Sequence, residues 1–211
     1  MIVVFDMDEC IASLSKPCFE YHMYLDKGVA FPEYFTQNLR TELLNKYLRP
    51  GIIDVLSTLY DCRKNPKILP VSHIVLMTNA SNRDNWVNFI TDIIDDIVTI
   101  DKKSKSPLFD VLLPRDSDKR LQITKYAYKY YGGQQPKFMI DVYSALKCCT
   151  TEPIVMYDDK EGHIVPVSGS KNFITKVSPY HFYQKDKHNK FKTFSEFFPP
   201  LVQAWMHENR L

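Results

Sequence analysis

The sequence predicts an α/β fold built on a doubly wound, mainly parallel, Rossmann-like sheet, and three observations support this prediction. Short apolar runs rich in β-branched residues, at residues 2–5, 73–77 and 154–157, are typical of strands buried on both faces of a parallel sheet. Segments with the apolar spacing of amphipathic helices separate these runs. Polar side chains follow each run directly, at the edge of the sheet where open α/β folds bind ligands.

Composition is that of an ordinary globular protein. The chain has 211 residues, enough for one well-buried domain spanning 1–211 and short for two. A net charge of +2 gives no strong field toward nucleic acid, and no apolar run approaches the roughly 20 residues of a membrane span. The 5 cysteines lack C-x-x-C spacing, and Asp6 and Asp8 interrupt any signal-peptide core. We therefore expect an intracellular protein, nuclear or cytoplasmic, that is not secreted.

The stretch after the first strand predicts a small insertion at about 14–48. Its prolines and scattered aromatics favour an excursion from the sheet that is hairpin-like at first. The spacing of Leu39, Leu43 and Tyr47 then predicts a helix over 36–47. A second helix follows from residue 52, where apolar residues recur at helical spacing.

The second half of the chain alternates helices with strands. The clearest helix is at 86–97, where large apolar side chains recur at steps of three and four residues. Gly132 and Gly133 are expected to end a helix, and Pro153 to introduce a buried strand. The further elements expected are helices at 119–131 and 138–149, strands at 109–113, 164–167 and 173–177, and a last helix after Pro200.

Carboxylates and a hydroxyl group follow three of the apolar runs. Asp6 and Asp8 follow the first, Thr78 the second, and Asp158 and Asp159 the third. Parallel neighbouring strands would bring these groups together, and four carboxylates in one place would repel one another. A divalent cation relieves this repulsion, and hard oxygen ligands suit Mg²⁺, with Mn²⁺ as an alternative. Carboxylates around such an ion, with a hydroxyl group and a lysine, indicate phosphoryl transfer.

These residues resemble the motifs of the haloacid dehalogenase superfamily. Residues 4–9 resemble its first motif, Asp-x-Asp-x-Thr, residues 77–79 its second and residues 157–159 its fourth. Within that superfamily the sequence is most similar to phosphatases of the FCP and SCP type, which act on the C-terminal domain of RNA polymerase II. Residues 48–51 add to this similarity, whereas Cys10 stands where the family has Thr.

The resemblance implies a role for each carboxylate. Asp6 would be the nucleophile that forms an aspartyl-phosphate. Asp8 would protonate the leaving oxygen and then take a proton from the attacking water. Asp6, the backbone carbonyl of Asp8, and Asp158 would bind Mg²⁺, with Asp159 as a further ligand or as a partner of one.

The resemblance also implies two groups that contact the phosphoryl oxygens. Thr78 would donate a hydrogen bond to them. A lysine upstream of the fourth motif would neutralise them. Lys137 fits best, because Pro136 precedes it and an apolar helix is expected after it, and Lys119 and Lys125 are the alternatives.

The length of the insertion bears on the substrate. A short insertion, with no room for a second domain between Leu113 and Lys137, predicts an open site. An open site favours phosphoserine or phosphothreonine in a protein or peptide over an enclosed metabolite.

One alternative is a 5'-nucleotidase or polynucleotide phosphatase, with 36–47 as a small helical cap and nucleic acid as substrate only in that case. The other is an inactive phosphopeptide-binding module, against which the retained acidic residues argue. No membrane partner is expected.

Overall fold

Five parallel strands form the central sheet of the computed structural model, which describes residues 1–28, 33–49, 51–67, 69–102, 106–131, 133–158, 164–168 and 173–177. The strand order is β3-β2-β1-β5-β7, and every neighbouring pair is parallel. The strands are β1 (Ile2–Phe5), β2 (His73–Met77), β3 (Val111–Leu113), β5 (Ile154–Asp158) and β7 (Phe173–Val177). The predicted α/β fold with a doubly wound parallel sheet is therefore confirmed, although β3 is shorter than expected.

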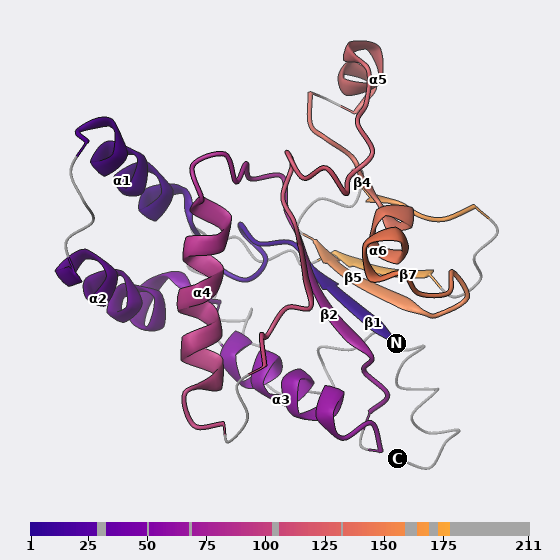
Figure 1. Cartoon of the computed structure of the whole chain (residues 1–211), viewed down its shortest axis with the longest axis horizontal. Helices are drawn as coiled ribbons and strands as arrows, with labels where there is room; N and C mark the ends of the chain where they lie inside the picture. Colours follow the sequence, from indigo (N-terminus) through magenta and orange to yellow (C-terminus); the bar gives the residue numbers. More distant parts are fainter. Residues whose placement is uncertain are drawn as a thin grey trace.

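Helices cover both faces of this sheet (Figure 1). On one side lie α1 (Ser15–Asp26), α3 (Ile52–Lys64) and α4 (Trp86–Thr99), and on the other side lies α6 (Met139–Leu146). Alternate strand residues serve the two faces, since Val3 and Phe5 belong to the first core and Ile2 and Val4 to the second. The strands are apolar on both faces because both faces are buried.

The insertion is helical from its start, so the expectation of a hairpin there was wrong. Helix α1 is followed by α2 (Glu33–Glu42) and by the π-helix η1 (Leu43–Tyr47). Pro17 does not break α1, because it lies in the first turn, where backbone N–H groups have no partner within the helix. Tyr21 anchors α1 on α4: its ring centroid lies 5.1 Å from that of Trp86 and 5.0 Å from that of Phe89.

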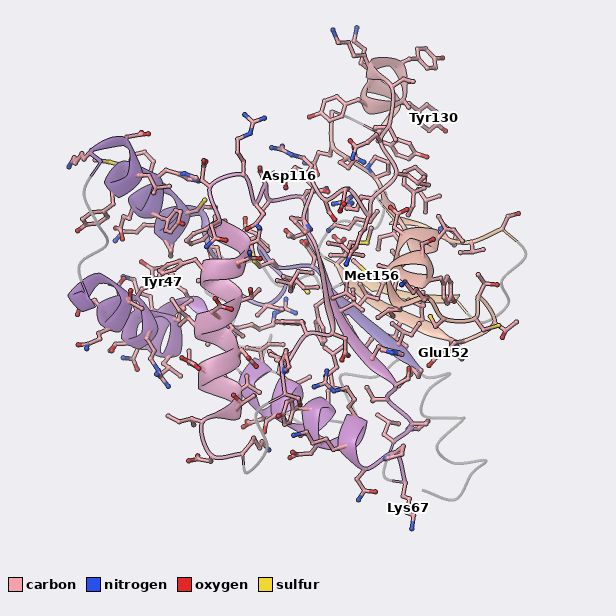
Figure 2. All side chains as sticks on the ribbon, viewed as in Figure 1. Tyr47, Lys67, Asp116, Tyr130, Glu152 and Met156 are labelled. Atoms are coloured by element: carbon pink, nitrogen blue, oxygen red, sulfur yellow. The ribbon has the colours of Figure 1, made fainter. Side chains whose placement is uncertain are left out.

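The segment between β3 and α6 differs most from the predicted helix at 119–131. Only α5 (Lys125–Tyr130) is helical there, and it projects beyond the sheet with Tyr130 exposed (Figure 2). Residues 120–122 do not join the helix because side chains bond their backbone: Asp141 accepts from the Leu121 N–H, and Gln135 donates to the Leu121 carbonyl. A small parallel sheet of β4 (Lys137–Phe138) and β6 (Ile164–Val165) follows.

Two expected elements in the second half of the chain are shorter in the structure. The helix expected at 138–149 is shorter, because it begins after β4 and ends where Lys147 adopts a left-handed conformation. The strand expected at 164–167 is limited to β6. The expected last helix lies outside the described residues. Within the described part of the chain, we find no helix with the length and apolar character needed to cross a bilayer.

Candidate active site

The strand order reverses between β1 and β5. From β1 the chain moves outward to β2 and β3, and then returns to the other side of β1 with β5 and β7. Such a reversal opens a crevice at the carboxyl ends of the strands. Asp6 directly follows β1 and Asp158 ends β5, and the register that pairs Phe5 with Tyr157 sets the two aspartates level. The sheet therefore brings together two carboxylates that are far apart in the sequence.

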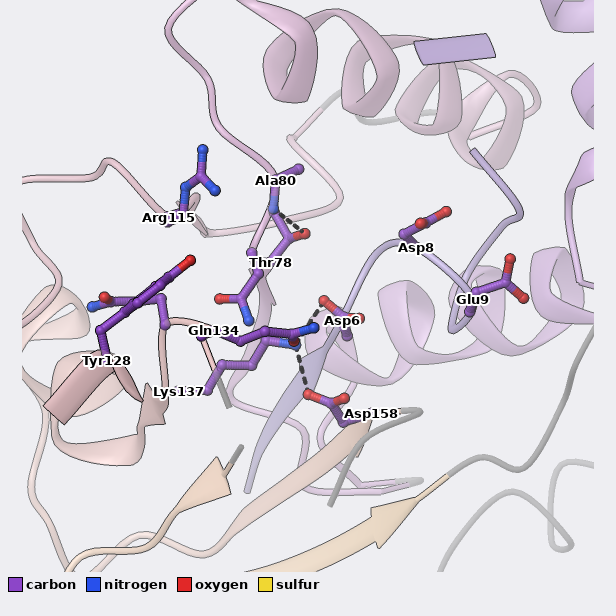
Figure 3. A pocket seen from close by; sticks show the side chains of 13 residues that line it. Asp6, Asp8, Glu9, Thr78, Ala80, Arg115, Tyr128, Gln134, Lys137 and Asp158 are labelled. Atoms are coloured by element: carbon purple, nitrogen blue, oxygen red, sulfur yellow. Dashed lines mark hydrogen bonds and ion pairs between the residues drawn. The ribbon is translucent and has the colours of Figure 1, made fainter. Parts of the chain in front are cut away.

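Lys137 lies between these two carboxylates (Figure 3). Its Nζ is 2.8 Å from Oδ1 of Asp6 and 2.6 Å from Oδ2 of Asp158. All three side chains are buried, and Lys137 is only 2% exposed. An ammonium group at this depth requires charged partners, because burial without them is costly. The two carboxylates meet that requirement, and the lysine in turn offsets part of the electrostatic repulsion between them.

Burial makes ionisation of Asp6 costly. Burial, and secondarily the charge of Asp158, raise the pKa of Asp6 to about 6 despite the opposing effect of Lys137. The pKa of Lys137 is raised by both carboxylates, which outweigh the opposing effect of its burial. Two buried carboxylates share this ammonium group, and a further cation would favour their ionised forms.

Lys137 reaches this position from a strand that is two residues long. β4 pairs with β6, and α6 begins at the next residue, Met139. The alternative lysines lie elsewhere: Lys119 and Lys125 are exposed, and neither lines the cavity above Asp6. Of the three lysines considered from the sequence, Lys137 is the one that lines the cavity and contacts Asp6 and Asp158.

Thr78 lies at the end of β2, beside the same crevice. The residue is buried, and its N–H donates to the Leu113 carbonyl, which fixes the backbone. Its Oγ1 accepts a hydrogen bond of 3.1 Å from the Ala80 N–H. The hydroxyl proton therefore remains for an acceptor in the cavity, as the predicted contact with a phosphoryl oxygen requires.

The Asp8 carboxylate does not join the pair formed by Asp6 and Asp158. Oδ1 of Asp8 accepts a 2.7 Å hydrogen bond from the Leu14 N–H, at the start of α1. Figure 3 shows the Asp8 carboxylate directed away from Asp6 and Asp158, although Asp8 lines the same cavity. Asp159 lies outside the described residues. The roles expected for both residues stay predictions.

The donor set fits a magnesium ion. Mg²⁺ in proteins is commonly held by one or two carboxylates, with water and phosphate oxygens completing an octahedron. Asp6 and Asp158 are two hard oxygen donors that lie close enough to contact the same ammonium group. Among the described residues no group of three or more His, Cys, Asp or Glu side chains is placed to hold a metal. A two-carboxylate site completed by backbone and water oxygens is the arrangement that these residues support.

Cys10 is held inside the protein rather than presented to a substrate. Its Sγ donates to the carbonyl oxygen of Tyr157 at 3.3 Å, so it makes a hydrogen bond in the place where the resembled family has Thr. Burial, with the charge of Asp6, raises the pKa of this thiol far above its ordinary value. A thiol that stays protonated is a poor nucleophile, which supports a packing role.

The cavity has further polar walls that the sequence did not single out. It has a volume of about 350 Å³, and besides the residues above it is lined by side chains of the segment between β3 and β4, among them Arg115, Tyr128, Gln134 and Gln135. Arg120 lies behind this wall with its guanidinium group buried. In the sequence these residues look like an ordinary polar loop, and no local pattern separates Arg120 from its exposed neighbour Lys119.

Comparisons with known proteins found one kind of similarity, to a solved structure. No protein-family model matches the chain, and no curated protein is found to be similar to it. Among solved structures the chain is similar to CbbY from Rhodobacter sphaeroides, crystallised in complex with phosphate. The two chains share 12% sequence identity over 96% of this chain and 98% of the other, with a TM-score of 0.48. At this level of similarity, neither activity nor substrate can be transferred from CbbY to this chain.

Proposed function

We propose that this protein is a magnesium-dependent phosphomonoester hydrolase of the haloacid dehalogenase type, with Asp6 as its nucleophile. The observation that carries the proposal is the contact of one buried ammonium group, that of Lys137, with both Asp6 and Asp158. The motif resemblance assigns to these three residues the roles of nucleophile, metal ligand and phosphoryl-binding lysine, and their contact supports that assignment. A covalent phosphatase needs these groups within reach of one phosphorus atom.

Asp6, Asp158 and the backbone carbonyl of Asp8 would hold the magnesium ion, with Asp159 adjacent in sequence. The ion, when bound, neutralises phosphate charge so that a carboxylate can approach the phosphorus. The raised pKa of Asp6 supports this assignment, because a bound cation would favour the ionised carboxylate that the reaction needs.

In the proposed reaction a carboxylate oxygen of Asp6 attacks the phosphorus, and the bond to the ester oxygen breaks. Asp8 gives a proton to the departing oxygen, which requires its carboxylate to exchange the Leu14 N–H for the cavity. Lys137 and Thr78 donate to the phosphoryl oxygens during the transfer. Asp8 then takes a proton from a water molecule, whose oxygen attacks the phosphorus and releases Asp6 and inorganic phosphate.

The substrate that we propose is phosphoserine or phosphothreonine within a protein or peptide. The supporting observation concerns the insertion, since none of the described residues that line the cavity comes from α1 or α2. A site that these helices leave uncovered admits a phosphorylated side chain on a large chain. The wall beside it offers an amide group from Gln134 and a hydroxyl group from Tyr128, which suit a polypeptide backbone.

A second candidate is hydrolysis of nucleotides or of phosphorylated polynucleotide ends. The helical character of the insertion favours it, because a small helical cap was the feature expected of such an enzyme. A phosphopeptide-binding module without turnover is the remaining alternative. The same ionisable groups would serve such a module, so only kinetics separates it from the enzyme.

A hydrolysis screen with Mg²⁺ tests these proposals. Purified protein is assayed for phosphate release from phosphoserine and phosphothreonine peptides, nucleoside monophosphates and 3'-phosphorylated oligonucleotides, alongside D6N and the control D92N, which removes an exposed carboxylate of α4. We expect peptide turnover that D6N abolishes and D92N retains. Turnover of nucleotides alone would select the second candidate. Peptide binding without turnover, equal in D6N, would overturn the enzyme proposal.

A further inference from the structure

Arg120 is buried between exposed neighbours. The residue is 2% exposed, in the loop between β3 and α5, whereas Lys119 is exposed and Leu121 is 51% exposed. Burying a guanidinium group is costly unless its hydrogen-bonding capacity is used. The contacts that it makes therefore identify what the burial achieves.

The guanidinium group of Arg120 donates hydrogen bonds to two separate segments beside the cavity, residues 78–79 and Pro136. Nη1 donates to the Thr78 carbonyl at 2.7 Å. Nη2 donates to the Pro136 carbonyl at 2.8 Å and to Oδ1 of Asn79 at 3.2 Å. One rigid group thus connects the end of β2 to the residue directly before Lys137. Thr78 and Lys137 are the two donors that the proposed reaction directs at phosphoryl oxygens.

The positive charge of Arg120 strengthens its hydrogen bonds to Thr78, Asn79 and Pro136. Among the described residues no carboxylate lies within salt-bridge distance of it, although the charges of Asp141 and Asp6 favour its ionised form. The Asp141 carboxylate accepts instead from the Leu121 N–H. Burial lowers the pKa of Arg120 to about 10, so the group remains charged at neutral pH. Hydrogen bonds from a charged donor are about twice as strong as neutral ones and hold their acceptors more firmly.

Arg120 does not itself line the cavity, so it has no contact with a substrate there. A lysine in its place would be a point charge, unable to span three acceptors in one plane. The planar fork is what matches carbonyl groups from two segments that are 42 and 16 residues away along the chain.

We propose that Arg120 is a positioning residue that sets the distance between Thr78 and Lys137 and so matches the two donors to a transferring phosphoryl group. The inference rests on the proposed phosphatase function. If the donors are placed for the transition state, loosening them slows the chemical step more than it weakens substrate binding. Arg120 variants should therefore lose kcat and keep KM.

The test compares R120A and R120K with K119A, which removes an adjacent exposed charge. We expect R120A to lower kcat roughly 10- to 100-fold, as for a misplaced catalytic contact, with KM within about threefold of the wild type. R120K should fall between R120A and the wild type, and K119A should match the wild type. Guanidinium chloride at low millimolar concentration should restore part of the kcat of R120A, without effect on the wild type or K119A.

Each outcome decides one point. A wild-type protein that hydrolyses no phosphomonoester overturns the proposed function and this inference with it. An active wild type whose R120A variant keeps its kcat overturns the role of Arg120 alone. So does a loss that guanidinium does not restore and that follows the fraction of unfolded protein in a thermal scan. If R120A does not fold, R120K decides: a lower kcat with unchanged KM and melting temperature supports positioning, and an unchanged kcat overturns it.

Discussion

Two segments could have formed the cover of the candidate site, and the structure gives them different tasks. The insertion that contains α1 and α2 begins shortly after Asp8 in the sequence, yet none of its described residues lines the cavity. The segment from Pro114 to Pro136 lies farther along the chain, and it supplies Arg115, Tyr128 and Gln134 to the cavity wall. Position in the sequence next to a catalytic motif therefore does not by itself identify the element that meets the substrate.

The difference between the two segments has a physical cause. The insertion is fixed by apolar and aromatic packing, since Tyr21 contacts Trp86 and Phe89 and donates to the Asp84 carbonyl at 2.7 Å. That anchor holds α1 beside α4 (Figure 1). The segment between Pro114 and Pro136 is fixed mainly by polar contacts, through Arg120 and Gln135. We expect the first to govern stability and the second to govern catalysis and substrate affinity.

The largest effect should come from Lys137, where the second segment ends. The substitution K137M leaves Asp6 and Asp158 as two buried carboxylates without their shared cation, which should cost about 3–5 kcal/mol of unfolding free energy. It should also lower kcat at least about 100-fold. Urea unfolding and phosphate-release kinetics check both, with K125M as the exposed control. Retained activity in K137M would contradict the assignment of this lysine.

The anchor of the insertion should give the next largest effect, on stability alone. Y21A removes a buried ring and a hydrogen bond and should cost about 3–4 kcal/mol. Hydrolysis of a small ester such as p-nitrophenyl phosphate should keep its kcat within about twofold in the folded variant, because no described residue of the insertion lines the cavity. F19A is the matched control, since Phe19 on the same helix is 65% exposed. A large loss of kcat in folded Y21A would mean that the insertion does reach the substrate.

The wall of the second segment should affect substrate affinity. Y128A should raise KM for the natural ester about 3- to 10-fold, as expected for one lost contact of about 1 kcal/mol, with little change in kcat. Tyr126 provides the control, because it is on the same short helix, 83% exposed and outside the cavity lining. Equal KM values in Y128A and Y126A would show that this wall does not select the substrate.

The smallest effect concerns the ionisation of Asp6, which belongs to neither segment. The pKa of Asp6 is raised from 3.8 to about 6 in the folded protein, so the folded state holds this proton more tightly than the unfolded chain. Its contribution to stability therefore falls as pH rises from about 4 to 6, and at pH 8 the buried charge is unfavourable. With metal removed by EDTA, D6N should be more stable than the wild type at pH 8 by on the order of 1 kcal/mol. Melting temperatures at pH 8 and pH 4 check the sign, and an advantage that grows at low pH would contradict it.

Three residues of the candidate site could be predicted from the sequence, because the topology of the sheet determines where they lie. Parallel strands bring their carboxyl ends to one edge, so Asp6, Thr78 and Asp158 follow from the apolar runs that precede them. Lys137 was harder, because a two-residue strand has no periodicity. The resemblance called for a lysine before the fourth motif, and Pro136 and the apolar helix expected after Lys137 favoured it over Lys119. Pro17 misled the prediction of α1, because a proline in the first turn looks the same in sequence as one in a loop. Arg120 was missed, since its burial depends on carbonyl groups distant in the chain.

The central claim is that Asp6 carries the phosphoryl group during turnover. The most direct measurement is acid quenching of the protein during steady-state hydrolysis, followed by mass spectrometry of its peptides. The account predicts a phosphorylated Asp6 in the peptide from the N-terminus of the wild type, and none in D6N. Steady turnover with no covalent phosphate on Asp6, or with phosphate on another side chain, would contradict it.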